Sequence, residues 1–307
     1  MTTSLKKYLL VGLKGIGMGA ADVIPGVSGG TIAFMTGIYE ELVGSINSIN
    51  GTAVKLLFKG KFRDFWKHIN GNFLISVVAG ILISIMSLAK LMTYLLNYEP
   101  IPTWAFFFGL IVASSVFMLR DIKGWKGRDF VMLVLGIILG VVVCTLSPTQ
   151  TPDALWFIFL SGAIAICAMI LPGISGSFIL LILGKYEFML STLTKILSGE
   201  GVLLDFAVVL VFILGALVGI LAFSKFLHWL LARYHRSTLL VLVGFIIGSL
   251  VKVWPWSDME TVREAQLLRE GTLLEIDMQI PWAIVWALVG AALVTFLEIM
   301  AHRKAEK

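Results

Sequence analysis

The stretch Ile24-Pro-Gly-Val-Ser-Gly-Gly30 decides how this chain folds, because it returns downstream as Leu171-Pro-Gly-Ile-Ser-Gly-Ser177. In both copies the likeness continues into a Gly-x-Tyr-Glu sequence, which ends at Glu40 in the first copy and at Glu187 in the second. Chance does not readily produce the same two motifs twice at the same separation. We therefore infer an internal duplication of the chain.

Each copy predicts a break between two helices. Pro-Gly ends a helix, Ser is a favoured N-cap residue, and the apolar run that follows begins a new helix. The resulting hairpins cover 5–48, with arms 5–24 and 31–48, and 154–197, with arms 154–171 and 178–197. Each arm spans about 25–30 Å as a helix, which is marginal for a hydrocarbon core of about 30 Å. Re-entrant hairpins and pairs of short spans are both compatible with these lengths.

The composition indicates an all-α polytopic membrane protein. Of the 307 residues, 58% are hydrophobic and 14% are charged, and the mean hydropathy is +0.95. A soluble chain carries about 25% charged residues. The net charge of +5 does not require a nucleic-acid partner, because basic residues collect in the cytoplasmic loops of membrane proteins.

The duplication predicts two repeats, 1–150 and 151–307, that have opposite orientations in the membrane. Each repeat contains one hairpin and three further apolar segments: 72–96, 104–119 and 130–146 in the first, and 203–224, 238–254 and 282–301 in the second. Three crossings are an odd number, so the second repeat begins on the opposite side. This inverted repeat recurs in secondary transporters. The polar stretch 257–277 predicts a short surface helix.

The loop charges support this topology independently. If the N-terminus is cytoplasmic, every loop Lys or Arg falls on the cytoplasmic side except Lys195, Arg263 and Arg269. That distribution follows the positive-inside rule. We therefore expect both termini in the cytoplasm, one hairpin inserted from each side, and the two breaks meeting near the membrane midplane.

The paired breaks predict an anion site. Irregular backbone at membrane depth is tolerated only when it is buried in protein or lines a cavity. The helices after the breaks direct free N–H groups toward that cavity, glycines admit a ligand close to the backbone, and hydroxyls add donors. This chemistry suits a phosphate or carboxylate, whereas the alternative is a close helix crossing that small residues permit. The candidates are Pro25, Gly26, Ser28, Gly29, Gly30, Thr31, Pro172, Gly173, Ser175, Gly176 and Ser177.

Charged residues within the first arm are candidates for ion coupling. Asp22 precedes the first break, where apolar surroundings and the negative helix end favour its protonated form. It could carry a coupling proton or bind Na⁺, and its counterpart in the second repeat is Met169. Lys14 lies on roughly the same face, and could pair with Asp22 or extend to the cytoplasm. Glu40 and Glu187 are further coupling candidates, although an interfacial role also fits them.

Lys90 and Lys185 are expected toward the outer face. Together they could attract an anionic headgroup from the outer leaflet. The alternative for both is ordinary snorkelling of a long side chain to the interface.

Enzymatic chemistry is poorly supported. The four histidines lie in or beside loops without zinc-site spacing, and neither an HExxH motif nor a P-loop occurs. The Gly-x-Ser-Gly-Gly sequence at 26–30 would need a preceding strand and a histidine partner to act as a nucleophile turn. We expect no catalytic residue, no metal and no cofactor.

Residues Gly19 to Tyr39, together with the motif at 171–177, resemble a bacterial membrane family long classed as a domain of unknown function. That family is assigned to transport of polyprenyl phosphate, chiefly undecaprenyl phosphate, and the resemblance covers nearly the whole chain. It implies a flippase in the bacterial cytoplasmic membrane that returns this carrier lipid from the outer to the inner leaflet, for reuse in peptidoglycan and envelope synthesis. Ser177 replaces a glycine of the first copy, which the duplication tolerates.

Taken together, the residues predict the anion site and the resemblance identifies the anion as a lipid phosphate. A small-anion channel or ion-coupled exchanger is the main alternative, because the paired helix breaks could bind a bare anion equally well. An intramembrane lipid phosphatase is a third possible function. Without an ATP-binding motif, we expect a passive process or one driven by H⁺ or Na⁺. A homo-oligomer is compatible with the sequence.

Overall fold

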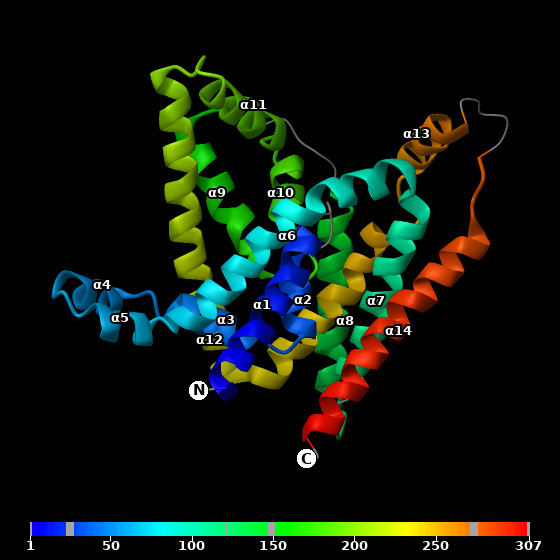
Figure 1. The fold of residues 1–307 in the computed structure, drawn as a ribbon, viewed down its shortest axis with the longest axis horizontal. Coiled ribbons are helices and arrows are strands. Elements are labelled where there is room, and N and C mark those ends of the chain that lie inside the picture. Colours follow the sequence, from blue (N-terminus) through cyan, green and yellow to red (C-terminus); the bar gives the residue numbers. More distant parts are fainter. Residues whose placement is uncertain (1, 23–27, 121, 147–150, 271–275, 306–307) are drawn as a thin grey trace. The chain divides into compact units, whose positions relative to one another are not determined.

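The computed structural model describes residues 2–22, 28–120, 122–146, 151–270 and 276–305 (Figure 1). Within these ranges the regular structure is helical and contains no strand. The all-α prediction is therefore confirmed.

The chain divides into two compact units. Unit 1 combines Met1–Ile85 with Leu146–His235, and unit 2 combines Met86–Thr145 with Arg236–Lys307. Each unit therefore takes one segment from each predicted repeat, so the repeats 1–150 and 151–307 are not themselves the compact units. The duplication and its inverted orientation stay predictions.

The two hairpins lie in unit 1, and their helices have matching bounds. The repeat places Gly176 opposite Gly29 and Tyr186 opposite Tyr39, and helices begin at all four positions. The first hairpin contains α1 (Thr2–Asp22), α2 (Gly29–Met35) and α3 (Tyr39–Asn47); the second contains α9 (Leu155–Ile170), α10 (Gly176–Ile182) and α11 (Tyr186–Leu197).

The prediction that the second arms, 31–48 and 178–197, are continuous helices is wrong. Gly37 and Gly184 interrupt them in the left-handed region, with φ of 72° and 63°. In both, the residue after the glycine donates its N–H five residues back: Ile38 to the Ala33 carbonyl oxygen at 3.0 Å, and Lys185 to that of Leu180 at 2.8 Å. This is the Schellman arrangement that ends helices at glycine. The repeated Gly-x-Tyr-Glu sequence is therefore a second turn, which bends α10 from α11 by 108°.

Unit 1 also contains two short helices and parts of two long helices, and the long helices pack against the hairpins. It holds α4 (Gly51–Phe58), α5 (Phe62–His68), the first part of α6 (Gly71–Tyr98) and the first part of α12 (Leu203–Val253). α6 crosses α1 so closely that a Cβ on Gly80 would meet the Gly12 carbonyl oxygen. A Cβ on Gly215 of α12 would likewise meet the Phe159 carbonyl oxygen of α9. Small residues thus permit close helix packing, as is common in membrane proteins.

Unit 2 contains the rest of α6 and α12 with four further helices. These are α7 (Pro100–Arg120), α8 (Gly127–Cys144), α13 (Met259–Glu270) and α14 (Ile280–Ala305). α7 and α14 lie side by side (Figure 1), with a core of Ile101, Ala105, Val262 and Ala283 at the end near α13. The short helix predicted within 257–277 is confirmed as α13.

Two predicted loops are largely helical. Within 97–103, α6 ends at Tyr98 and α7 begins at Pro100, so Glu99 alone separates them. Proline is tolerated in the first turn of a helix, where its missing N–H would have no intrahelical partner. Residues 225–237 lie inside α12, which deviates from helical geometry at Tyr234 (φ −130°, ψ 42°). The run 225–237 therefore contains a kink at Tyr234 where two helices join, and no separate loop.

By length and composition, three described helices can cross a membrane: α7, α8 and α12. The number rises to five if each of two bent pairs, α5 with α6 and α10 with α11, forms one span. We predicted six spans beside the hairpins; α12 contains two of them, 203–224 and 238–254. α9 and the segment Ile280–Phe296 of α14 are apolar but shorter than a full span.

Candidate functional site

The two predicted breaks contact each other in unit 1. The Ser28 hydroxyl donates a hydrogen bond to the Leu171 carbonyl oxygen at 3.3 Å. In the other direction, the Gly173 N–H donates to Thr31 Oγ1 at 2.7 Å. Ser28 is 0% exposed and Thr31 is 1% exposed. The breaks therefore meet as predicted, at a point screened from solvent, while their depth in the membrane stays a prediction.

Serine N-caps begin both short helices, as the sequence predicted. Ser28 is extended and its hydroxyl accepts from the Gly30 N–H at 3.1 Å. Ser175 is also extended and accepts from the Phe178 N–H at 3.2 Å. The Ser177 hydroxyl lies 3.2 Å from that of Ser175. Each cap satisfies one N–H group that the first helical turn leaves without an intrahelical partner.

Asp22 occupies the start of α2. Its Oδ1 accepts a hydrogen bond from the Gly29 N–H at 2.7 Å. A Cβ on Gly29 would lie 2.5 Å from Asp22 Oδ2, so glycine is required for the carboxylate to come this close. The position favoured by an anion at a helix N-terminus is thus held by a carboxylate of the protein itself.

The neighbouring glycines serve close packing between the helices. A Cβ on Gly30 would lie 2.9 Å from the Ile170 carbonyl oxygen, and one on Gly176 would lie 2.9 Å from that of Ala165. This geometry agrees with the alternative to an anion site, namely that small residues at the breaks permit a close helix crossing. Gly173 adopts a φ of 99°, which other residues rarely adopt.

Lys14 lies at the other end of α2 from Asp22. Its Nζ donates to the Thr36 carbonyl oxygen at 2.6 Å, and Thr36 is the C-cap of α2. The predicted pairing of Lys14 with Asp22 is replaced by these separate contacts. A carboxylate at the N-terminal end and an ammonium at the C-terminal end both complement the helix dipole.

Lys185 is engaged within the protein. It is 1% exposed, and its Nζ lies 2.5 Å from Asp153 Oδ1 and 2.8 Å from the Thr151 carbonyl oxygen. Lys90 lies in α6, and its side chain is outside the described residues. The role of both lysines in attracting an anionic headgroup stays a prediction.

The remaining predicted residues lie outside this contact or serve it indirectly. Glu40 and Glu187 are exposed, and Glu40 Oε1 is 3.7 Å from His235 Nε2. Pro25 and Gly26 are outside the described residues. Pro172 is buried and follows Leu171, whose extended backbone (φ −66°, ψ 129°) releases its carbonyl from the helix.

Two groups at or near the hairpins were missed from the sequence, and a third, Tyr39, was noted there only as part of the repeated Tyr-Glu pair. The Leu171 carbonyl could have been found, because a residue before proline leaves the helical region. Asp153 is the partner of Lys185, and its position in the sequence does not predict this contact. Tyr39 is 2% exposed, and its hydroxyl has no hydrogen-bond partner within the described part of the chain.

Comparisons with known proteins agree on one family. A family model described as VCA0040-like, undecaprenyl phosphate translocase-like, matches residues 18–269. The chain is 42% identical to a protein of Vibrio cholerae serotype O1 named polyprenyl-phosphate transporter, over 99% of this chain and 100% of the relative. A Staphylococcus aureus protein of the same name is 34% identical, over 79% of this chain and 85% of the relative. No solved structure matches.

Proposed function

We propose that this chain, which belongs to the undecaprenyl phosphate translocase-like family, transports a polyprenyl phosphate across the membrane. The names of both relatives support that substrate. The apolar helices support a multi-pass membrane location.

The phosphate of the lipid binds at the two helix breaks. The observation that carries this proposal is the buried pair of hydrogen bonds between them, Ser28 to Leu171 and Gly173 to Thr31. Moving an ionised group through hydrocarbon without compensation would cost tens of kcal/mol in an idealised medium. The breaks supply backbone N–H groups and hydroxyls that can replace the water around a phosphate.

Binding requires an exchange of partners, because these donors are engaged within the protein. The Gly29 N–H is held by Asp22, and the Gly173 N–H by Thr31. A phosphate would take the place of the Asp22 carboxylate at the start of α2 and separate the two breaks. The contact observed here is then the closed arrangement of the site, and transport alternates between it and an open one.

Asp22 is the proposed coupling group. Two anions cannot share the Gly29 N–H without strong repulsion. A phosphate therefore displaces Asp22 most readily when the charge of the Asp22 carboxylate is neutralised. A proton or Na⁺ could supply that neutralisation. The polyprenyl chain remains in lipid while the phosphate crosses.

The direction of transport is from the outer to the inner leaflet of the bacterial cytoplasmic membrane. The loop charges favour cytoplasmic termini. In an inverted repeat with that topology, one hairpin enters from each side of the membrane. Such a flippase would return the carrier lipid for peptidoglycan and envelope synthesis.

The experiment uses the purified chain in vesicles whose outer leaflet carries undecaprenyl phosphate. The fraction of this lipid left in the outer leaflet is followed under a proton or sodium gradient, with protein-free vesicles as control. We expect protein-dependent loss that excess inorganic phosphate does not inhibit. Uptake of labelled inorganic phosphate without lipid movement would contradict the proposal and favour the small-anion channel or exchanger.

A further inference from the structure

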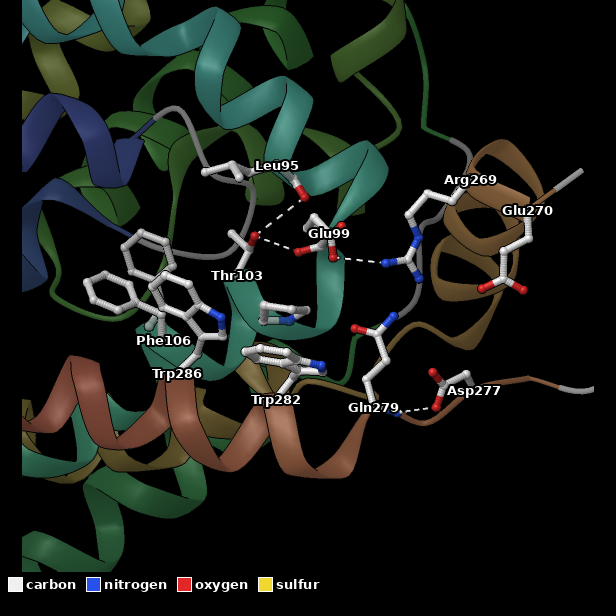
Figure 2. A pocket seen from close by; sticks show the side chains of 12 residues that line it. Leu95, Glu99, Thr103, Phe106, Arg269, Glu270, Asp277, Gln279, Trp282 and Trp286 are labelled. Carbon is white, nitrogen blue, oxygen red and sulfur yellow. Dashed lines mark hydrogen bonds and ion pairs between the residues drawn. The ribbon is translucent and has the colours of Figure 1, made fainter.

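Unit 2 contains a pocket of about 580 Å³ that the proposed function does not use (Figure 2). It lies where the starts of α7 and α14 meet α13 and the end of α6. One side is aromatic and the other is polar, and this division identifies the kind of molecule that fits.

The aromatic side belongs to apolar helices. Phe106 of α7 and Trp286 of α14 contact each other edge to face, with ring centroids 6.5 Å apart. Trp282 lies one turn earlier on α14 and is 60% exposed. Since α7 is long and apolar enough to cross a membrane, we infer that lipid lies next to this aromatic wall. Tryptophan is enriched where such helices enter the headgroup region.

The polar side carries both signs of charge. Arg269 Nη1 lies 2.9 Å from Glu99 Oε2, and the Gln279 side-chain amide faces the guanidinium and accepts from it when its oxygen is turned toward Arg269. Figure 2 shows Arg269 and Gln279 pointing toward each other, with Asp277 beside Gln279. Asp277 is held in place because its Oδ1 accepts the Gln279 N–H at 2.9 Å.

The charges do not balance within the pocket. Glu99 pairs with Arg269. Within the described part of the chain, the carboxylates of Asp277 and Glu270 form no ion pair, although Glu270 Oε2 accepts a hydrogen bond from the neutral Gln266 side chain at 3.0 Å. An ammonium group would satisfy these carboxylates and would also be attracted by the tryptophan faces. Arg269 has five N–H donors, so an anionic group beside the ammonium can bind it as well.

We propose that this pocket binds the headgroup of a zwitterionic aminophospholipid of the phosphatidylethanolamine class. The ammonium contacts Asp277 and Glu270, the phosphodiester contacts Arg269, and an acyl chain lies along Trp282 and Trp286. A polyprenyl phosphate lacks an ammonium and would meet the two carboxylates with its own negative charge. The pocket is therefore a second lipid site, distinct from the breaks.

The test is isothermal titration calorimetry on the purified full-length chain in detergent. The probes are dihexanoyl phosphatidylethanolamine, phosphatidylcholine and phosphatidylglycerol, with free ethanolamine as a fourth. We expect phosphatidylethanolamine to bind most tightly. Phosphatidylglycerol and ethanolamine should bind about tenfold more weakly, because each lacks one half of the contacts. Phosphatidylcholine should be intermediate, because its quaternary ammonium cannot donate hydrogen bonds.

Asp277→Asn keeps an oxygen for the Gln279 N–H but removes a charge, and should weaken phosphatidylethanolamine binding about tenfold. Phosphatidylglycerol binding should not weaken. Glu264→Gln is the matched control, because it removes an exposed carboxylate from the same polar region outside the pocket, and it should change nothing. Three results would overturn the proposal: equal binding of phosphatidylglycerol, equal binding of free ethanolamine, or an Asp277→Asn variant that binds phosphatidylethanolamine normally. None of them bears on transport at the breaks.

Discussion

The two helix breaks share a backbone plan but differ in charge. At the first break, α2 has Asp22 at its N-terminal end and Lys14 at its C-terminal end. At the second, Met169 stands opposite Asp22 in the repeat, and the carbonyl of Leu183, the C-cap of α10, accepts from the neutral hydroxyl of Thr151. The two breaks therefore have matching helix turns, but the carboxylate of Asp22 has no acidic counterpart at position 169.

Among the changes that test this difference in charge, Asp22→Asn should have the largest effect. The amide oxygen can still accept the Gly29 N–H, so the break keeps its shape while losing its charge. If Asp22 is the coupling group, gradient-driven transport should fall by a factor of about 10 to 100, measured by the vesicle assay with and without a gradient.

A matched control exists at Asp205, a half-buried carboxylate that accepts the Val202 N–H at 2.9 Å. Asp205→Asn repeats the same chemical change away from the breaks and should leave transport unchanged. Gradient-driven transport at the wild-type rate in Asp22→Asn would show that the charge difference between the breaks has no part in coupling.

Thr31→Val tests the contact that joins the breaks. Its counterpart in the second repeat is Phe178, so the hydroxyl belongs to the first break alone. Valine would leave the buried Gly173 N–H without its partner, which should lower the free energy of unfolding by about 1–3 kcal/mol. Denaturant unfolding in micelles measures this change. Thr145→Val, at an exposed hydroxyl bonded to its own helix, should leave the free energy of unfolding almost unchanged. If both variants lowered it equally, the hydrogen bond between the breaks would not contribute more than an ordinary exposed one.

Gly37→Ala and Gly184→Ala test the feature that the two hairpins share. Both glycines have positive φ, so each alanine should lower the free energy of unfolding by about 1–2 kcal/mol, by similar amounts. Gly51 of α4 does not have a positive φ, and a Cβ there would meet open space. Gly51→Ala is therefore the control in the same unfolding measurement. A loss at only one of the two glycines would contradict the matching turns.

The smallest effects should come from Glu40→Gln and Glu187→Gln. Both side chains are exposed, and an exposed pair such as Glu40 with His235 contributes about 0–1 kcal/mol. We expect unfolding and transport close to wild type in both variants. If either change abolished the gradient dependence, the coupling role would move from Asp22 to the end of the hairpin.

Local chemistry explains which features of the site could be predicted. Pro-Gly followed by Ser fixed both breaks and both N-caps, and the duplication indicated that they would meet. The same reasoning did not identify the turns at Gly37 and Gly184, because a single glycine in an apolar run is also tolerated within a helix. Once the chain turns there, the Thr36 carbonyl comes within reach of Lys14, a contact that helical spacing between Lys14 and Asp22 cannot reveal.

The overall fold could likewise be predicted from the sequence only in part. Apolar runs predicted the helices, but the charged run 225–237 predicted a loop where α12 has only a kink at Tyr234. The partners of Lys185 depend on a connection distant in sequence, so no periodicity encodes them.

The most direct test of the central claim, that the phosphate binds at the paired breaks, compares two double variants in the vesicle assay. Ser28→Ala/Ser175→Ala removes the N-cap hydroxyl from both breaks. Ser76→Ala/Ser191→Ala removes two exposed hydroxyls that each bond a carbonyl of their own helix. The account predicts that the first pair abolishes movement of undecaprenyl phosphate and that the second leaves it intact. Wild-type transport by a folded Ser28→Ala/Ser175→Ala protein would contradict it.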